Sequence, residues 1–117
     1  MRQARNYQAG LAAEASVLRH YLASGHSLLA QRYRGVHGEI DLVLQRGSDV
    51  IFVEVKKSRS FDAAALRLGA QQIDRIFQTA SEFLGTQPQG QMTPARFDVA
   101  LVNAHGEVSV LENALAA

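Results

Sequence analysis

The 117 residues of this chain include no cysteine and no long hydrophobic run. Without cysteine the chain has no disulfide and no thiolate metal site, which excludes a zinc ribbon. No apolar stretch approaches the ~18 residues that a membrane-spanning helix needs. The basic segment Met1–Asn6 is not followed by an uninterrupted apolar stretch, so we expect no secretory signal. These absences favour a cytoplasmic protein with no membrane partner.

Strong net charge and the common phosphate-binding motifs are also absent. The formal net charge is only +1, which argues against a protein that coats nucleic acid by charge alone. The four histidines show no metal-ligand spacing on one helix, so zinc is not expected. There is no glycine-rich phosphate loop, Walker lysine or serine nucleophile elbow. The length and the 47% hydrophobic content fit one globular domain over residues 1–117.

Two apolar segments of this chain carry charged residues in their interior. Gly38–Val43 contains Asp41, and Ile51–Lys56 contains Glu54 and ends on a lysine. Both segments have the composition of buried strands, and residues 46–50 between them suit a hairpin turn. Two carboxylates and an ammonium group are costly to desolvate, so a fold needs a reason to hold them together. A bound divalent cation is one such reason.

Alternation along a strand predicts which of these side chains share a face. Glu54 and Lys56 lie on one face of their strand, and Val53 and Val55 lie on the other. In the preceding strand Asp41 lies with Glu39 and Val43, and the residues predicted to point away are Ile40, Leu42 and Leu44.

The rest of the chain alternates between helical and extended patterns. Helices are expected over 3–24 and 63–84, the second broken or kinked near Gly69, and strands over 27–34, 39–45, 50–57, 95–103 and 107–111. Both prolines fall in the loop 85–94. This order predicts an α/β fold in which helices flank a mixed sheet.

An Asp followed by Glu-x-Lys on the next strand resembles the PD-(D/E)xK nuclease superfamily. With Glu14 in the first helix, the Gly38–Asp41 and Phe52–Lys56 blocks, and Arg96–Val99, the chain resembles the bacterial UPF0102 (YraN-like) family from Gly10 to Ala114. The resemblance implies a restriction-endonuclease-like αβββαβ core.

Asp41 and Glu54 offer the hard oxygen ligands that Mg²⁺ or Mn²⁺ takes in proteins. Lys56 would assist attack on a phosphate by supplying positive charge beside it. The resemblance adds the carbonyl of Val55 as a metal ligand and Glu14 as the residue that completes the site. It also implies an auxiliary role for Gln72.

The chain departs from the family pattern at three places. Gln71 and Gln72 stand where family members often carry a lysine, and an amide supplies no charge to a phosphate. Ser58 replaces an arginine that often follows the motif lysine, with Arg59 one place later. Asp62 stands where a glycine usually follows the aromatic residue.

Basic residues gather in the middle of the chain around the acidic strands. Two interpretations stay open for these residues, a phosphate-binding surface or a set of solvated strand ends and helix faces. The residues are Arg32, Arg34, Lys56, Lys57, Arg59, Arg67 and Arg75. Arg96 and Asp98 would share a face of an edge strand and form an ion pair. Apolar residues near the end of the chain suit either a homodimer contact or the core: Val108, Val110, Leu111 and Leu115.

Three hypotheses about function follow from these residues. The first is a magnesium-dependent nuclease-like protein acting on DNA phosphodiester bonds, including branched or single-stranded DNA. The second is a non-catalytic nucleic-acid-binding or assembly module that retains the nuclease fold. The third is that Asp41, Glu54 and Lys56 form only a structural ion network.

Overall fold

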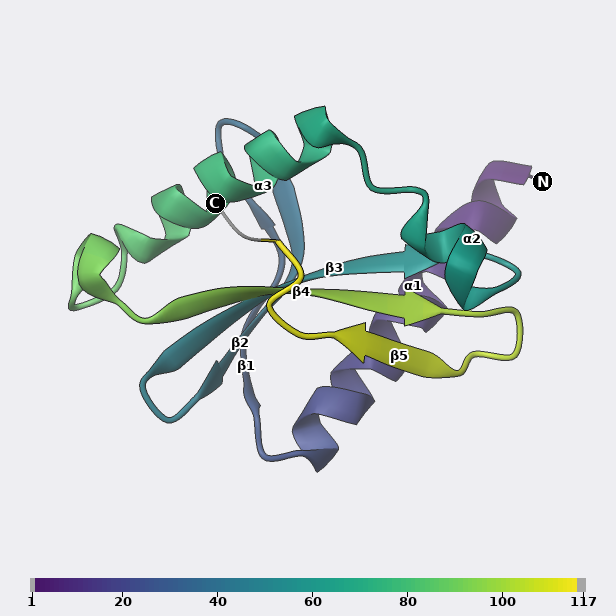
Figure 1. The fold of residues 1–117 in the computed structure, drawn as a ribbon, viewed down its shortest axis with the longest axis horizontal. Helices are drawn as coiled ribbons and strands as arrows, with labels where there is room; N and C mark the ends of the chain where they lie inside the picture. Colours follow the sequence, from purple (N-terminus) through teal and green to yellow (C-terminus); the bar gives the residue numbers. More distant parts are fainter. Residues whose placement is uncertain (1, 116–117) are drawn as a thin grey trace.

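The computed structural model describes residues 2–115, with side chains from residue 9 onward, and Figure 1 shows its five-stranded sheet. The strands, in sheet order, are β1 (Ser27–Arg34), β2 (Glu39–Arg46), β3 (Asp49–Lys57), β4 (Ala95–Val102) and β5 (Val108–Leu111). Only β3 and β4 pair in parallel, and the other neighbours are antiparallel. The helices are α1 (Arg2–Ala23), α2 (Phe61–Ala65), α3 (Ala70–Leu84) and the 3₁₀ turn η1 (Gly90–Met92). The predicted α/β fold with a mixed sheet is confirmed, and it is consistent with a restriction-endonuclease-like core.

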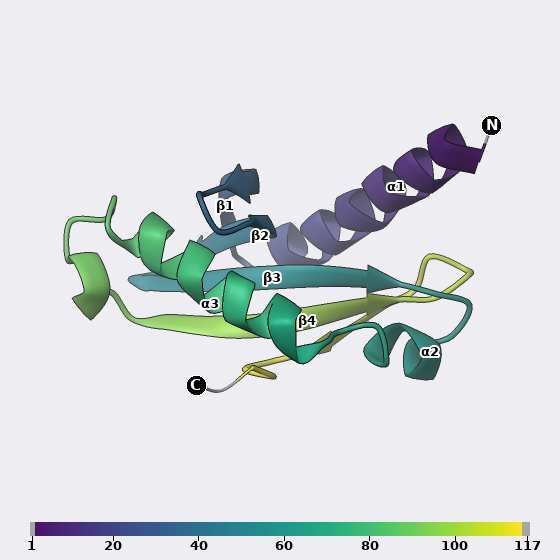
Figure 2. The same ribbon diagram turned by 90° about the horizontal axis from the view of Figure 1, so that it is seen from above.

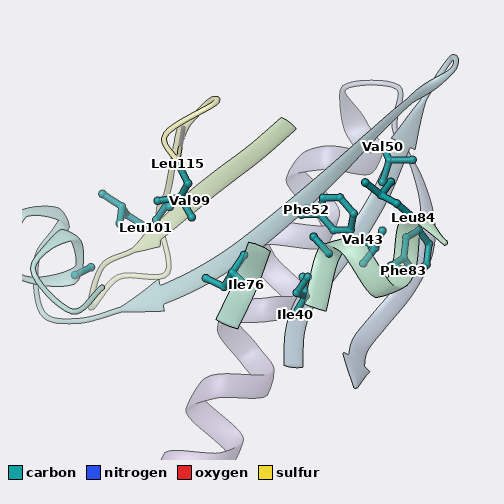
Figure 3. Packing of buried hydrophobic residues seen from close by; sticks show 12 residues of the cluster. Ile40, Val43, Val50, Phe52, Ile76, Phe83, Leu84, Val99, Leu101 and Leu115 are labelled. Carbon is teal, nitrogen blue, oxygen red and sulfur yellow. The ribbon is translucent and has the colours of Figure 1, made fainter. Parts of the chain in front are cut away.

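Helices cover both faces of the sheet (Figure 2). Residues of α1, including Val17 and Tyr21, pack on one face against Leu42, Leu44 and other strand residues. The opposite face packs against α2, α3 and the end of the chain. Figure 3 shows this second cluster, whose members include Ile40, Val43, Val50, Phe52, Ile76, Phe83, Leu84, Val99, Leu101 and Leu115.

Local sequence signals position two of the boundaries. The hairpin between β2 and β3 has a two-residue turn at Gly47 and Ser48, shorter than the predicted 46–50, because Arg46 still pairs with Asp49. Gly47 has φ 60°, which glycine adopts without steric cost. The break predicted near Gly69 is confirmed, since this residue is the N-cap of α3.

One face assignment is wrong, at Ile40. Alternation along the strand predicts that this residue lies with Leu42 and Leu44, but it packs with Val43 on the α3 side of the sheet. The register between β2 and β3 ends at the pair Leu42 and Val53. Beyond that pair the regular ladder gives way to bonds that involve side chains, so strict alternation no longer applies. The irregularity falls at Asp41, which is where the charged side chains of the two strands meet.

Strand β4 is not the edge strand that the sequence predicts for Arg96 and Asp98. It lies between β3 and β5, because the terminal strand pairs with it on its outer side. The predicted ion pair is present, with Arg96 Nε donating to Asp98 Oδ1 at 3.1 Å. Asp98 is only 1% exposed, whereas the Arg96 side chain is 31% exposed, so the pair is half-buried.

The apolar residues at the end of the chain mostly complete the core. Val108 and Val110 pack against the α1-side cluster, and Leu115 is buried on the α3 side. Leu111 is 43% exposed, and its part in a homodimer stays a prediction. Among the helices described, none has the length and apolar character required to cross a bilayer.

Candidate metal centre

Asp41 and Glu54 meet where β2 and β3 stop pairing, and each interacts with the other strand. Asp41 Oδ2 accepts a hydrogen bond from the backbone N–H of Val55 at 2.8 Å. The backbone N–H of Asp41 points in turn to Glu54 Oε1, at 3.4 Å. Side-chain oxygens therefore take the place of carbonyl oxygens in the ladder. This exchange holds two carboxylates together inside the sheet.

Burial makes the two carboxylates hard to ionise together. Desolvation raises the pKa of Asp41, and the charge of Glu14 raises it further, while the N–H of Val55 and the charge of Lys56 lower it. Desolvation and the negative charge of Asp41 raise the pKa of Glu54 to about 8. Near neutral pH the pair therefore retains a proton. A divalent cation would favour loss of that proton. Its positive charge offsets both the desolvation and the carboxylate repulsion that raise the pKa of Glu54.

The donor chemistry of this pair fits a hard cation. Magnesium is commonly held by one or two protein carboxylates, with water and phosphate oxygens supplying the other ligands. Asp41 and Glu54 meet that requirement. In the part of the chain that the structure describes, no group of three or more His, Cys, Asp or Glu side chains is arranged to hold a metal. A site at Asp41 and Glu54 therefore relies on non-carboxylate ligands, for which the Val55 carbonyl stays a prediction.

Glu14 lies near the pair but is bound to an arginine. Arg32 Nε and Nη2 donate to its two carboxylate oxygens at 3.1 and 3.0 Å. Arg32 has φ 50°, a left-handed conformation that is uncommon for residues other than glycine. Residues 31 and 33 pair with Leu42 and Ile40, so Arg32 falls beside Asp41 in the register. The structure thus assigns Glu14 an ion-pair partner and brings its charge close enough to act on Asp41.

Lys56 and Gln72 approach the pair from β3 and α3. The charge of Lys56 lowers the pKa of both Asp41 and Glu54. Gln72 Nε2 is 3.5 Å from Glu54 Oε2, the limit of a hydrogen bond. Gln72 also lines a hollow of about 440 Å³, together with Gln71 and Arg75. The predicted cluster of Asp41, Glu54, Lys56 and Gln72 is therefore brought together.

The residues predicted to contact phosphate fall into separate places. Arg34 pairs with Glu39 at 3.1 Å on the exposed end of β1. Arg75 lines the hollow beside Gln72. Lys57, Arg59 and Arg67 line a second hollow at the carboxyl end of β3. Arg67 follows Lys57 by ten residues, and α2 returns the chain so that Arg67 Nη1 donates to the Lys57 carbonyl at 2.9 Å.

The raised pKa of Glu54 predicts a pH dependence of stability in metal-free buffer. Because the folded pKa is about 8 and the ordinary value is 4.5, the folded state binds more protons between these limits. The free energy of unfolding should therefore fall by about 2–4 kcal/mol as pH rises from 5 to 8. Glu54→Gln should flatten this dependence. Urea unfolding of both proteins in EDTA, across that range, measures the difference, and equal pH slopes would contradict the assignment.

Comparison with known proteins gives a consistent family match. The model of the uncharacterised protein family UPF0102 matches residues 13–102. A UPF0102 protein of Cereibacter sphaeroides is 56% identical over 112 residues, covering 96% of each chain. A UPF0102 protein of Roseobacter denitrificans is 59% identical over 109 residues, or 93% of this chain and 84% of the relative. A third, from Ruegeria pomeroyi, is 53% identical over 113 residues, covering 97% of this chain and 92% of the relative.

Proposed function

The chain belongs to the uncharacterised protein family UPF0102, and from its charged cluster we propose a nuclease that acts on DNA phosphodiester bonds with Mg²⁺ or Mn²⁺. Branched and single-stranded DNA are the substrates we expect. The observation that supports this proposal most is the pair of half-buried Asp41 and buried Glu54 with Lys56 beside it. Ionising both carboxylates is costly unless positive charge is added, and a divalent cation supplies that charge.

Each residue of the cluster has a distinct part in the proposed reaction. Asp41 and Glu54 hold the cation through their carboxylates, with Asp41 oriented by the N–H of Val55. When bound, the cation stabilises charge on the phosphate and lowers the pKa of water. Lys56 adds a fixed positive charge that stabilises negative charge developing on the phosphate. Gln72 orients Glu54 from α3, although as an amide it supplies no charge itself.

The proposed role of Lys56 predicts a large effect on cleavage. Lys56→Gln should lower the rate of metal-dependent cleavage by about 100- to 1,000-fold, because a preorganised charge at the phosphate is removed. The assay uses end-labelled single-stranded, duplex and branched DNA with Mn²⁺ or Mg²⁺, and an EDTA control. Arg46→Gln is a matched control, since Arg46 is an exposed cation at the end of β2, beside the start of β3 and far from Lys56.

A cleaving wild type whose Lys56→Gln variant cleaves equally fast would refute the role of Lys56. Complete resistance of all three DNA forms in both metals would count against the nuclease itself. Cleavage that persists in EDTA would refute the metal requirement.

A non-catalytic nucleic-acid-binding module is the second candidate, and two observations favour it. Gln71 and Gln72 add no charge near the cluster, and Glu14 is occupied by Arg32. This alternative predicts salt-sensitive DNA binding that is equal in EDTA and in Mg²⁺. It also predicts that Asp41→Asn leaves that binding unchanged and that no DNA form is cut.

A further inference from the structure

A basic hollow of about 640 Å³ lies at the carboxyl end of β3, beyond Glu54 and Lys56. Its charged lining residues are Lys57, Arg59 and Arg67, and its floor and walls include Gly10, Ser58 and Ala104. Four segments therefore line it: the first half of α1, the β3–α2 connection, the α2–α3 connection and the β4–β5 turn. In Figures 1 and 2 these segments lie on the same side of the molecule.

Among the side chains described, from residue 9 to residue 115, no carboxylate lines this hollow. Arg32, Arg34 and Arg96 form ion pairs with carboxylates elsewhere in the fold. Within the same residues, by contrast, no salt bridge involves the three cations of the hollow. The guanidinium of Arg67 is held in place by the Lys57 carbonyl at 2.9 Å. Converging positive charge of this kind is the chemistry of an anion site.

The hollow is close to the charged cluster along two elements. Gly10 lies one helical turn before Glu14, a rise of about 6 Å along α1. Lys57 lies three residues after Glu54, about 10 Å along β3. Lys57 directly follows Lys56, and alternation along β3 directs its side chain to the opposite face of the sheet. An extended anion could therefore contact both the cluster and the hollow.

We propose that this hollow, defined by Lys57, Arg59 and Arg67, binds backbone phosphates of a single DNA strand next to the phosphate held at Asp41 and Glu54. The assignment of the ligand as DNA rests on the proposed function. With a volume of about 640 Å³, the hollow accommodates phosphates of one strand. A single strand is flexible enough to direct successive phosphates into the hollow, whereas a duplex is stiff, with a persistence length of about 50 nm.

The lining also predicts how the strand is recognised. None of the lining residues in the described part of the chain is aromatic, so these residues give bases no platform for the stacking that many single-strand binders use. Contacts from arginine and lysine to phosphate carry no sequence information. Binding at the hollow is therefore independent of base sequence and strongly dependent on salt.

The test measures binding of fluorescent 12-nucleotide strands by anisotropy in EDTA, with the full chain and several salt concentrations. Arg59→Gln with Arg67→Gln should weaken binding at least tenfold at low salt. The slope of log affinity against log salt should shrink by about 0.7 for each phosphate that the variant no longer neutralises. Arg46→Gln is the charge-matched control for Arg59→Gln, since each removes one positive charge and Arg46 lies about 26 Å from Lys57, at the other end of β3. Arg59→Gln alone, which leaves the Arg67 hydrogen bond intact, should show part of the weakening if the double variant is unstable.

Each further outcome supports or overturns the proposal. Equal affinity and slope for wild type and the pocket variants overturns it, as does an equal weakening in Arg46→Gln. Displacement of the strand by inorganic phosphate as effectively as by unlabelled strand, at matched ionic strength, assigns the hollow to a small anion instead. A duplex that binds better than a single strand also overturns it. Asp41→Asn should bind normally in EDTA. A wild type that binds through the hollow but cuts no DNA form in either metal would refute the nuclease while supporting the hollow.

Discussion

Asp41→Asn is expected to weaken binding of Mn²⁺ at least about 100-fold. Loss of a residue that only supports a metal ligand commonly costs 10- to 100-fold, and loss of a ligand should cost no less than that upper value. The variant should still fold, because an asparagine oxygen can accept the hydrogen bond from the N–H of Val55 that Asp41 Oδ2 now accepts at 2.8 Å. Calorimetric titration of Mn²⁺ into wild type and variant at pH 8 measures the difference.

The design of this titration separates a missing ligand from a damaged fold. Asp49→Asn removes a carboxylate from the exposed start of β3 and should bind Mn²⁺ as wild type does. Asp41→Asn removes the charge that raises the pKa of Glu54, so the variant should unfold in urea no earlier than wild type in EDTA. Equal Mn²⁺ affinity for wild type and a folded Asp41→Asn would refute the metal site. Release of protons on binding should accompany the wild-type signal.

The second large effect is expected at Asp98, where substitution by alanine should cost about 3–5 kcal/mol of stability. Its carboxylate accepts hydrogen bonds from Tyr21 Oη at 2.8 Å, from Arg96 and from the N–H of Asn113 at 2.9 Å. The substitution removes the acceptor of two donors, the Tyr21 hydroxyl and the Asn113 N–H. Among the described residues, the only ion pair that it leaves to half-buried Arg96 is the one with Glu112, at 3.8 Å. Urea unfolding measures the loss, and Asp49→Ala should change stability by less than about 0.5 kcal/mol.

The same variant tests whether Asp98, on β4, belongs to the candidate metal site. Burial and the Asp98 carboxylate raise the pKa of Tyr21, so the phenol remains a donor and the network joins α1 to β4. Although Asp98 lies opposite Val53 on the neighbouring strand, its oxygens are directed to Tyr21, Arg96 and Asn113. The Asp98→Ala variant should therefore bind Mn²⁺ normally at temperatures where it is folded. A loss of stability below about 1 kcal/mol, or a folded variant that fails to bind, would contradict a structural role.

Much of this architecture follows from patterns within short stretches of the sequence. Strand β1 has the bounds that its sequence predicts, and α3 ends at Leu84, where the second predicted helix ends. Val53 and Val55 lie on the α1 side, as alternation along β3 requires. Such features depend on neighbours a few residues apart, whose geometry the backbone period dictates.

The features that local sequence patterns failed to predict all depend on tertiary contacts. Ile40 changes face because β2 and β3 cease to pair beyond Leu42. Strand β4 is internal because β5 adds to its outer side. Arg67 joins Lys57 because the short helix α2 reverses the chain. Local periodicity carries no information about any of these three events.

The sequence by itself determined the family resemblance, the α/β fold and the two strands that carry Asp41, Glu54 and Lys56. Only the tertiary structure decided that Glu14 is paired with Arg32, that Asp98 belongs to a buried network, and that three cations surround one hollow. The physical reason is that a charged side chain takes whichever partner the register and the helix packing place within reach. Spacing along the chain predicts which charges are present, and packing selects their partners.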